Sequence, residues 1–172
     1  MFTNEIALYG VYGEKAKELK EIGLFDRILD VFLTAGVVGI IYGKKGIKKA
    51  EQTSVKIFAG QLNNELARIR YLSSLAYLIE NYNMKGDETT EKELLRQTFG
   101  DWFGECDVDS AKKYELFELY ALEGINILYD KIIGDKSDKD RYYENFYSFI
   151  EEINSIKIID EIDRTFLGAL NL

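Results

Sequence analysis

The chain contains no proline and no histidine, and it has a single cysteine, Cys106, among its 172 residues. Without histidine there is no imidazole base, no imidazole metal ligand and no Cys–His pair, and one cysteine cannot form a disulfide within the chain. A four-helix di-iron site, which uses Glu-x-x-His, is excluded for the same reason. The lone thiol fits a reducing compartment, and the N-terminus lacks a basic stretch followed by an apolar run. We therefore expect a cytoplasmic protein without a signal peptide.

Positive charge is also scarce: 22 Lys and Arg stand against 30 Asp and Glu, a net charge of −8. Nucleic-acid-binding proteins normally present a basic face that neutralises phosphates. We therefore expect no direct nucleic-acid binding except a local contact. Long apolar runs are absent as well, because residues 31–41 are interrupted by Thr34, Gly36 and Gly39, whereas a membrane-spanning helix needs about 20 residues. No membrane contact is expected.

What is present is enough for a folded core: 47% of the residues are hydrophobic and 13% are aromatic. Apolar residues recur at steps of three and four, which predicts an all-α fold. We expect a single-domain helical bundle over residues 1–172, with five to seven helices and a central apolar helix. The expected helices cover residues 4–20, 24–42, 52–83, 90–103, 110–133 and 138–154, and the tail 156–172 repeats apolar residues at steps of four.

The longest expected helix, 52–83, would extend about 48 Å at 1.5 Å per residue. That length predicts a bend near Gly60 or a break near Ser73–Ser74. The periodicity also selects a core. Its predicted members are Phe32, Val38, Ile41, Phe58, Leu62, Ile69, Leu72, Phe117, Ile125 and Leu128.

No pattern in the chain predicts catalysis. Cys106 lies between two acids, Glu105 and Asp107, and neighbouring negative charge disfavours a reactive thiolate. Residues 135–140 resemble the start of a calcium-binding loop but lack its glycine at the sixth position and its glutamate at the twelfth. The glycines at 43 and 46 lack the spacing of a P-loop. We expect a chain that is not an enzyme, with no catalytic residue, metal or cofactor.

A cluster of lysines is the first of two features that suggest binding. Lys44, Lys45, Lys48 and Lys49 are the densest positive charge in an otherwise acidic chain. They either solvate the carbonyl end of the preceding helix or contact a phosphate or an acidic partner surface.

A ladder of small residues, Ala35, Gly39 and Gly43, precedes those lysines at steps of four. On one helix face such a ladder lets another backbone approach closely. The approaching helix belongs either to this chain, in which case the next helix is the candidate, or to a partner. The aromatic residues of the last third, among them several tyrosines, are a composition favoured at protein interfaces.

Residues 24–45 resemble small accessory proteins of bacterial DNA-restriction loci, specifically those linked to DNA phosphorothioation. In that pattern an apolar helix with alanine and glycine leads into an aromatic residue, a glycine and a basic pair. The matching positions here are Phe32, Ala35, Gly39, Tyr42, Gly43, Lys44 and Lys45. The resemblance implies a non-catalytic component of a prokaryotic anti-phage defence complex that works beside an ATPase or a nuclease. It supplies no catalytic residue.

These observations lead to one main hypothesis and two alternatives. The main one is an accessory or scaffold subunit that acts through protein–protein contacts, with a homo-oligomer also open. The second is a small acidic regulator or inhibitor, phage-encoded in one version, whose carboxylates imitate nucleic acid. The third is a carboxylate-dependent metal enzyme.

Overall fold

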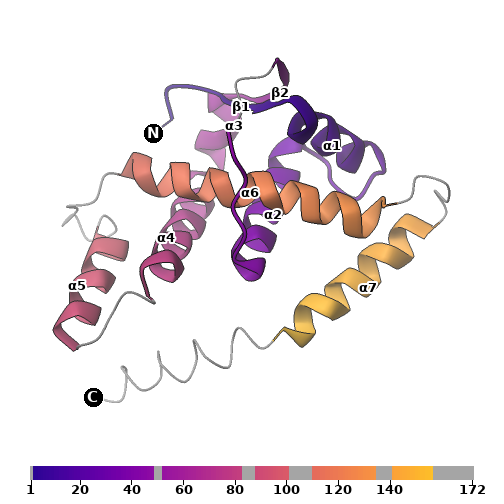
Figure 1. Cartoon of the computed structure of the whole chain (residues 1–172). Coiled ribbons are helices and arrows are strands. Elements are labelled where there is room, and N and C mark those ends of the chain that lie inside the picture. The colour runs from indigo at the N-terminus through magenta and orange to yellow at the C-terminus, as the bar shows by residue number, and fades with distance from the viewer. Residues whose placement is uncertain (1, 49–51, 83–87, 101–109, 135–140, 157–172) are drawn as a thin grey trace. The chain divides into compact units, whose positions relative to one another are not determined.

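A computed structural model describes residues 2–48, 52–82, 88–100, 110–134 and 141–156. The chain divides into two compact units, residues 1–129 and 130–172. The described residues form seven helices and one two-stranded sheet, so the predicted all-α class is confirmed (Figure 1). The elements are β1 (Ile6–Tyr9), α1 (Gly10–Glu21), α2 (Ile28–Tyr42), β2 (Thr53–Ile57), α3 (Ala59–Asn64), α4 (Leu66–Tyr82), α5 (Glu88–Phe99), α6 (Ser110–Ile132) and α7 (Tyr142–Ser155).

Helix α2 is the apolar helix that the sequence predicts, and nine of its fifteen residues are buried. It starts at Ile28 rather than Leu24. The Asp30 carboxylate accepts a hydrogen bond from the backbone N–H of Arg27 at 3.0 Å, as in half of a capping box. The Arg27 guanidinium donates to Asp30 at 2.7 Å and to Glu65 at 3.0 Å. The hydrogen bond from the Arg27 side chain is the main cause that lowers the pKa of Asp30.

The expected helix at 4–20 is partly wrong, because its first turn is the strand β1. This strand pairs antiparallel with β2, with Ile6 opposite Ile57 and Leu8 opposite Val55. Both Leu8 and Ile57 are fully buried. In β2, β-branched residues at positions 53, 55 and 57 alternate with Ser and Lys, a period of two that favours an extended strand over a helix.

The expected helix at 52–83 is likewise wrong over its first third. A strand, a short helix and a long helix replace it, and the chain turns at Glu65 rather than at Gly60 or Ser73–Ser74. Helix α4 runs unbroken through both serines. Glu65 is held at the turn because its carboxylate binds Arg27 and lies 3.8 Å from Arg68.

The predicted core is confirmed at most positions. Phe32, Val38, Leu62, Ile69, Phe117, Ile125 and Leu128 are buried, whereas Ile41 and Leu72 are half-buried. Phe58 is 61% exposed, so its placement in the core is wrong. It stands between β2 and α3 with extended backbone, where neither the strand nor the helix turns its side chain inward.

The second unit, residues 130–172, holds the end of α6 and all of α7. Within it Lys131 binds Glu152 at 2.6 Å, and the Asn145 side chain donates to the Ile132 carbonyl at 3.0 Å. Whether the chain forms one domain stays a prediction. The expectations for Cys106, the calcium-like stretch 135–140 and the tail from residue 157 lie outside the described residues.

Candidate functional site

The small-residue ladder packs against a helix of the same chain. A Cβ built on Gly39 would lie 2.1 Å from the carbonyl oxygen of Tyr120, and one on Gly124 would lie 1.8 Å from that of Ala35. Helices α2 and α6 therefore meet backbone to backbone. The expectation of packing against the next helix is corrected to α6, and the face carrying Ala35 and Gly39 is already occupied, which leaves no room there for a partner helix.

Gly43, the third member of the ladder, ends α2 instead of packing. Its φ is +61°. Its N–H binds the Ile40 carbonyl and the N–H of Lys44 binds the Gly39 carbonyl, both at 3.0 Å. This arrangement is a Schellman motif, in which glycine supplies the left-handed residue. A Cβ at Gly43 would meet nothing within 4 Å, so this glycine is needed for its backbone conformation.

The basic segment that follows, residues 44–48, crosses α6 (Figure 1). The N–H of Gly46 donates to the Leu119 carbonyl at 2.8 Å. Lys45 binds Glu80 of α4 at 2.6 Å, and Lys48 binds Glu118 of α6 at 2.9 Å. The segment is thus fixed by acids of its own chain. Lys49 lies outside the described residues.

Glu80 joins this segment to the middle of α6. It accepts hydrogen bonds from Lys45 and from the Tyr120 hydroxyl, both at 2.6 Å. The hydrogen bond from Lys45, and then that from Tyr120, lower the pKa of Glu80. Burial and the bond to Glu80 raise the pKa of Tyr120. Lys45 is thus held by a hydrogen-bonded network at the partly exposed edge of α4 and α6.

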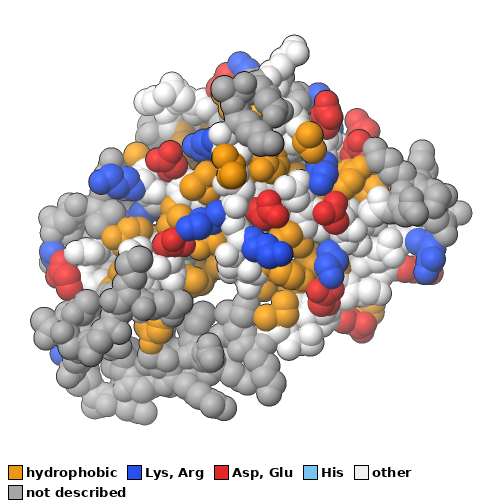
Figure 2. Space-filling model, viewed as in Figure 1, with side chains coloured by type: hydrophobic (Ala, Val, Ile, Leu, Met, Phe, Trp, Pro, Cys, Tyr) orange, Lys and Arg blue, Asp and Glu red, His pale blue; other side chains and the backbone are white. Residues whose placement is uncertain are grey.

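Among the residues that the structure describes, the face around this segment carries no concentrated basic patch. Figure 2 shows blue and red side chains interspersed with hydrophobic ones across the middle of this face. Such a mixed surface matches paired charges better than a phosphate-binding stripe. The contact of these lysines to phosphate or to an acidic partner stays a prediction.

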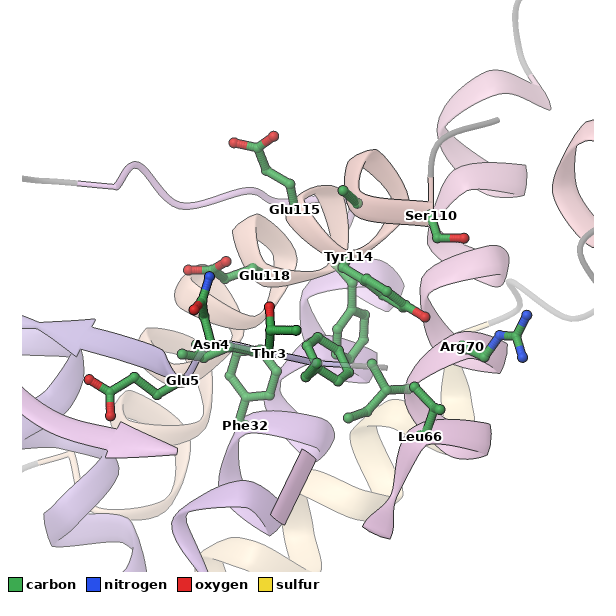
Figure 3. Close-up of a pocket in the computed structure, with 15 residues that line it drawn as sticks. Thr3, Asn4, Glu5, Phe32, Leu66, Arg70, Ser110, Tyr114, Glu115 and Glu118 are labelled. Atoms are coloured by element: carbon green, nitrogen blue, oxygen red, sulfur yellow. The ribbon is translucent and has the colours of Figure 1, made fainter. Parts of the chain in front are cut away.

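A groove of about 540 Å³ lies in the first unit, beside the N-terminal segment. Its volume falls within the range of about 300–1,000 Å³ that ligand pockets occupy. Buried rings and aliphatic chains of Phe32, Ile69 and Phe117 form its base. Its walls are residues 2–6, the start of α4 and the first turns of α6 (Figure 3).

The wall made by residues 2–6 is held in place by polar contacts. The Asn63 side chain accepts a hydrogen bond from the Phe2 N–H at 2.8 Å and donates one to the Phe2 carbonyl at 2.9 Å. The Phe2 ring lies 4.9 Å from that of Tyr114. Glu5 pairs with Lys56 on the neighbouring strand. The groove is therefore formed before anything binds.

The two ends of the groove differ in charge. In Figure 3, Glu5 and Glu118 lie at one end and Arg70 at the other, with Leu66 and Tyr114 near Arg70. Glu118 is bound by Lys48 at 2.9 Å. Glu115 is 65% exposed at the rim and lies 3.9 Å from the same lysine, so it is the least neutralised of the acids. The arrangement suits an apolar group next to a cation.

No pattern used in the sequence analysis predicts this groove. The sequence predicts a helix from residue 4, whereas residues 2–5 precede a strand and form one wall of the groove. The signal that could have found it is the alternating pattern of Ile6 and Leu8 opposite Val55 and Ile57, which indicates a paired strand.

Exposed aromatic residues mark α7. Tyr143, Tyr147 and Ile150 follow one another at steps of four and three and are exposed, whereas Tyr142 and Phe149 are buried. The interface-like tyrosines of the last third are therefore of two kinds. Tyr120 and Tyr129 also lie in the core, where Tyr129 donates to Glu18 at 2.8 Å.

Within the described ranges, no three Asp, Glu, Cys or His side chains lie close enough to hold a metal ion. None of the helices in the same ranges has the length and apolarity to cross a membrane. Comparison with protein-family models, with curated proteins and with solved structures yields no match to this chain.

Proposed function

We propose that this chain is a non-catalytic accessory subunit that acts by binding another protein. The preformed groove beside residues 2–6 carries this proposal. It is open, its base is apolar and its rim is charged, a combination that binding surfaces use to hold a side chain in a defined orientation. Its polar residues are glutamates, Asn4, Thr3, Ser110 and Arg70, and they surround no nucleophile–base pair.

We further propose that the complex served is a prokaryotic anti-phage defence complex of the DNA-restriction type, with an ATPase or nuclease as the partner. The resemblance of residues 24–45 supports this assignment. Ala35 and Gly39 allow α6 to approach, Gly43 closes the helix, and Lys45 binds Glu80. The motif thus builds the scaffold that carries the groove.

Paired charges argue against the nucleic-acid mimic. A mimic needs rows of free carboxylates, whereas Glu5, Glu80, Glu118 and Glu152 are each bound by a lysine. The net charge of −8 remains, but these four carboxylates are paired within the chain.

The test is genetic and biochemical. The gene is deleted from its native locus and phage plating is measured with and without complementation, while the tagged chain is purified together with the products of neighbouring genes. We expect deletion to abolish restriction and the chain to co-purify with an ATPase or nuclease at a fixed ratio. Unchanged plating together with no stable complex would overturn the proposal.

A further inference from the structure

We infer that the groove beside residues 2–6 receives an apolar side chain, preferably aromatic, from a basic segment of the partner protein. The inference rests on the proposed function and specifies its binding site. Four half-buried apolar side chains face the opening: Phe2, Ile6, Leu66 and Tyr114. An aromatic ring inserted among them would bury about 150–250 Å² and would stack against the Phe2 and Tyr114 rings.

The charged residues of the groove favour a basic residue next to the inserted ring. Three of the charged residues that line the groove are glutamates and one is an arginine. Lys56 binds Glu5 and Lys48 binds Glu118 closely, whereas Glu115 lies 3.9 Å from Lys48 and has the most exposed side chain of the three acids. A lysine or arginine beside the inserted ring would reach that carboxylate, and the net charge of −8 would attract such a segment from a distance.

The groove is also held rigidly enough to distinguish one bound segment from another. The Asn63 amide holds both backbone groups of Phe2, and Phe117 contacts Phe32 edge to face at 5.7 Å. A preformed site loses little conformational entropy on binding, so even a short segment retains measurable affinity. An acidic segment would meet Glu115 and be repelled.

The probes are three acetylated and amidated tripeptides: Lys-Phe-Lys, Lys-Ala-Lys and Glu-Phe-Glu. Lysine stands on both sides of the ring so that either chain direction places one near Glu115. Binding is followed by NMR, through the backbone amide shifts of residues 2–6, 66–70 and 110–118. We expect Lys-Phe-Lys to saturate these shifts. Lys-Ala-Lys should bind about tenfold more weakly, since it buries no ring.

Two pairs of variants locate the binding. Ala111→Trp fills the groove from an exposed position on α6, whereas Lys112→Trp adds the same ring at the neighbouring exposed position outside the groove lining. Glu115→Lys reverses the charge of the exposed rim carboxylate, and Glu14→Lys makes the same change of charge on the exposed side of α1. We expect the two groove variants to weaken Lys-Phe-Lys at least about fivefold, and the controls less than about twofold.

The outcomes separate this inference from the proposed function. Equal binding of the three peptides, or shifts that persist in Ala111→Trp, would overturn the groove as the site. If the partner complex forms with the wild-type chain and equally with Ala111→Trp and Glu115→Lys, the accessory role stands and the groove inference is wrong. If peptides bind as expected but no complex forms, the proposed function fails and the groove's specificity stands.

Discussion

Two glycines decide how closely α2 and α6 approach. At Gly39 and Gly124 the backbone of the opposite helix stands where a side chain would begin. Packed interiors tolerate little added volume, because neighbouring groups must leave their preferred positions to make room. Gly39 is therefore needed because a side chain there would collide with α6. Gly43 is needed because its backbone adopts a positive φ.

Gly39→Ala is the direct test of that contact. The new methyl group would collide with the Tyr120 carbonyl, so we expect a loss of about 1–3 kcal/mol in the free energy of unfolding. Gly60→Ala is the matched control, since a Cβ there meets nothing within 4 Å. It should leave stability unchanged or raise it by up to about 1 kcal/mol through helix propensity. Urea unfolding of both variants measures the difference, and equal stabilities would refute the close contact.

Leu62 and Phe58 show what periodicity can and cannot predict. Both belong to the same stripe in the sequence, yet Leu62 is fully buried and Phe58 is 61% exposed. A stripe identifies the core side of a helix only where the helix continues. At Phe58 the backbone passes from a strand into α3, and no pattern of spacing records that change of direction.

Alanine substitutions at Leu62 and Phe58 should therefore differ in how much they lower the free energy of unfolding. Leu62→Ala removes a buried side chain and should cost about 2–5 kcal/mol. Phe58→Ala should change stability by no more than about 0.5 kcal/mol, as expected for an exposed site. Thermal and denaturant unfolding give both values. A large loss at Phe58 would mean that its ring is covered in solution.

The basic segment, residues 44–48, makes contacts that the sequence alone does not predict. Two of the candidate binding lysines, Lys45 and Lys48, form ion pairs with acids of α4 and α6. The sequence contains no information on that pairing, because Glu80 and Glu118 are distant along the chain. By contrast, the sequence predicts α2, α6 and most of α7 well. In a long helix, the spacing of the apolar residues alone identifies the buried face. The groove was not predicted, because it depends on the pairing of two short strands.

Lys45→Glu tests the anchoring of that segment. The substitution places a carboxylate against Glu80, so we expect a loss of about 0.5–1 kcal/mol, modest because both side chains are partly exposed. Lys44→Glu changes the charge equally at an adjacent exposed position and should cost less. Unfolding in low and moderate salt should show the Lys45→Glu loss shrinking as salt increases. If Lys44→Glu lost as much stability as Lys45→Glu, the Lys45–Glu80 ion pair would not be the cause of the loss.

The same network predicts a pH effect. The pKa of Glu80 is lowered in the folded state from its ordinary value of 4.5, so the folded chain binds that proton less tightly than the unfolded chain. The stabilisation is therefore present above pH 4.5 and is lost as the pH falls through the folded-state pKa. Glu80→Gln should be less stable than wild type at pH 7, and the gap should narrow towards pH 3. Asp30 titrates in both proteins and cancels from the difference. A gap independent of pH would contradict the network.

At the scale of the molecule, burial is distributed unevenly. Nine of fifteen residues in α2 are buried, and α6 buries an almost continuous series that includes Phe117, Ala121, Ile125 and Leu128. In α7 only Tyr142 and Phe149 of fourteen residues are buried. Local stability follows buried apolar contact, because opening an element exposes what it had buried. The chain should therefore not open as one cooperative unit.

Native-state hydrogen exchange measures this distribution directly. We expect the amides of α2 and of α6 between residues 117 and 128 to exchange only through global unfolding. Those of α7 should exchange faster, through a smaller local opening. Gly39→Ala should speed exchange in α2 and α6 together, since it loosens the contact they share, and should leave α7 almost unchanged. Equal protection of α2 and α7, with equal sensitivity to denaturant, would show instead that both units unfold as one body, because only then does every amide report the global free energy of unfolding.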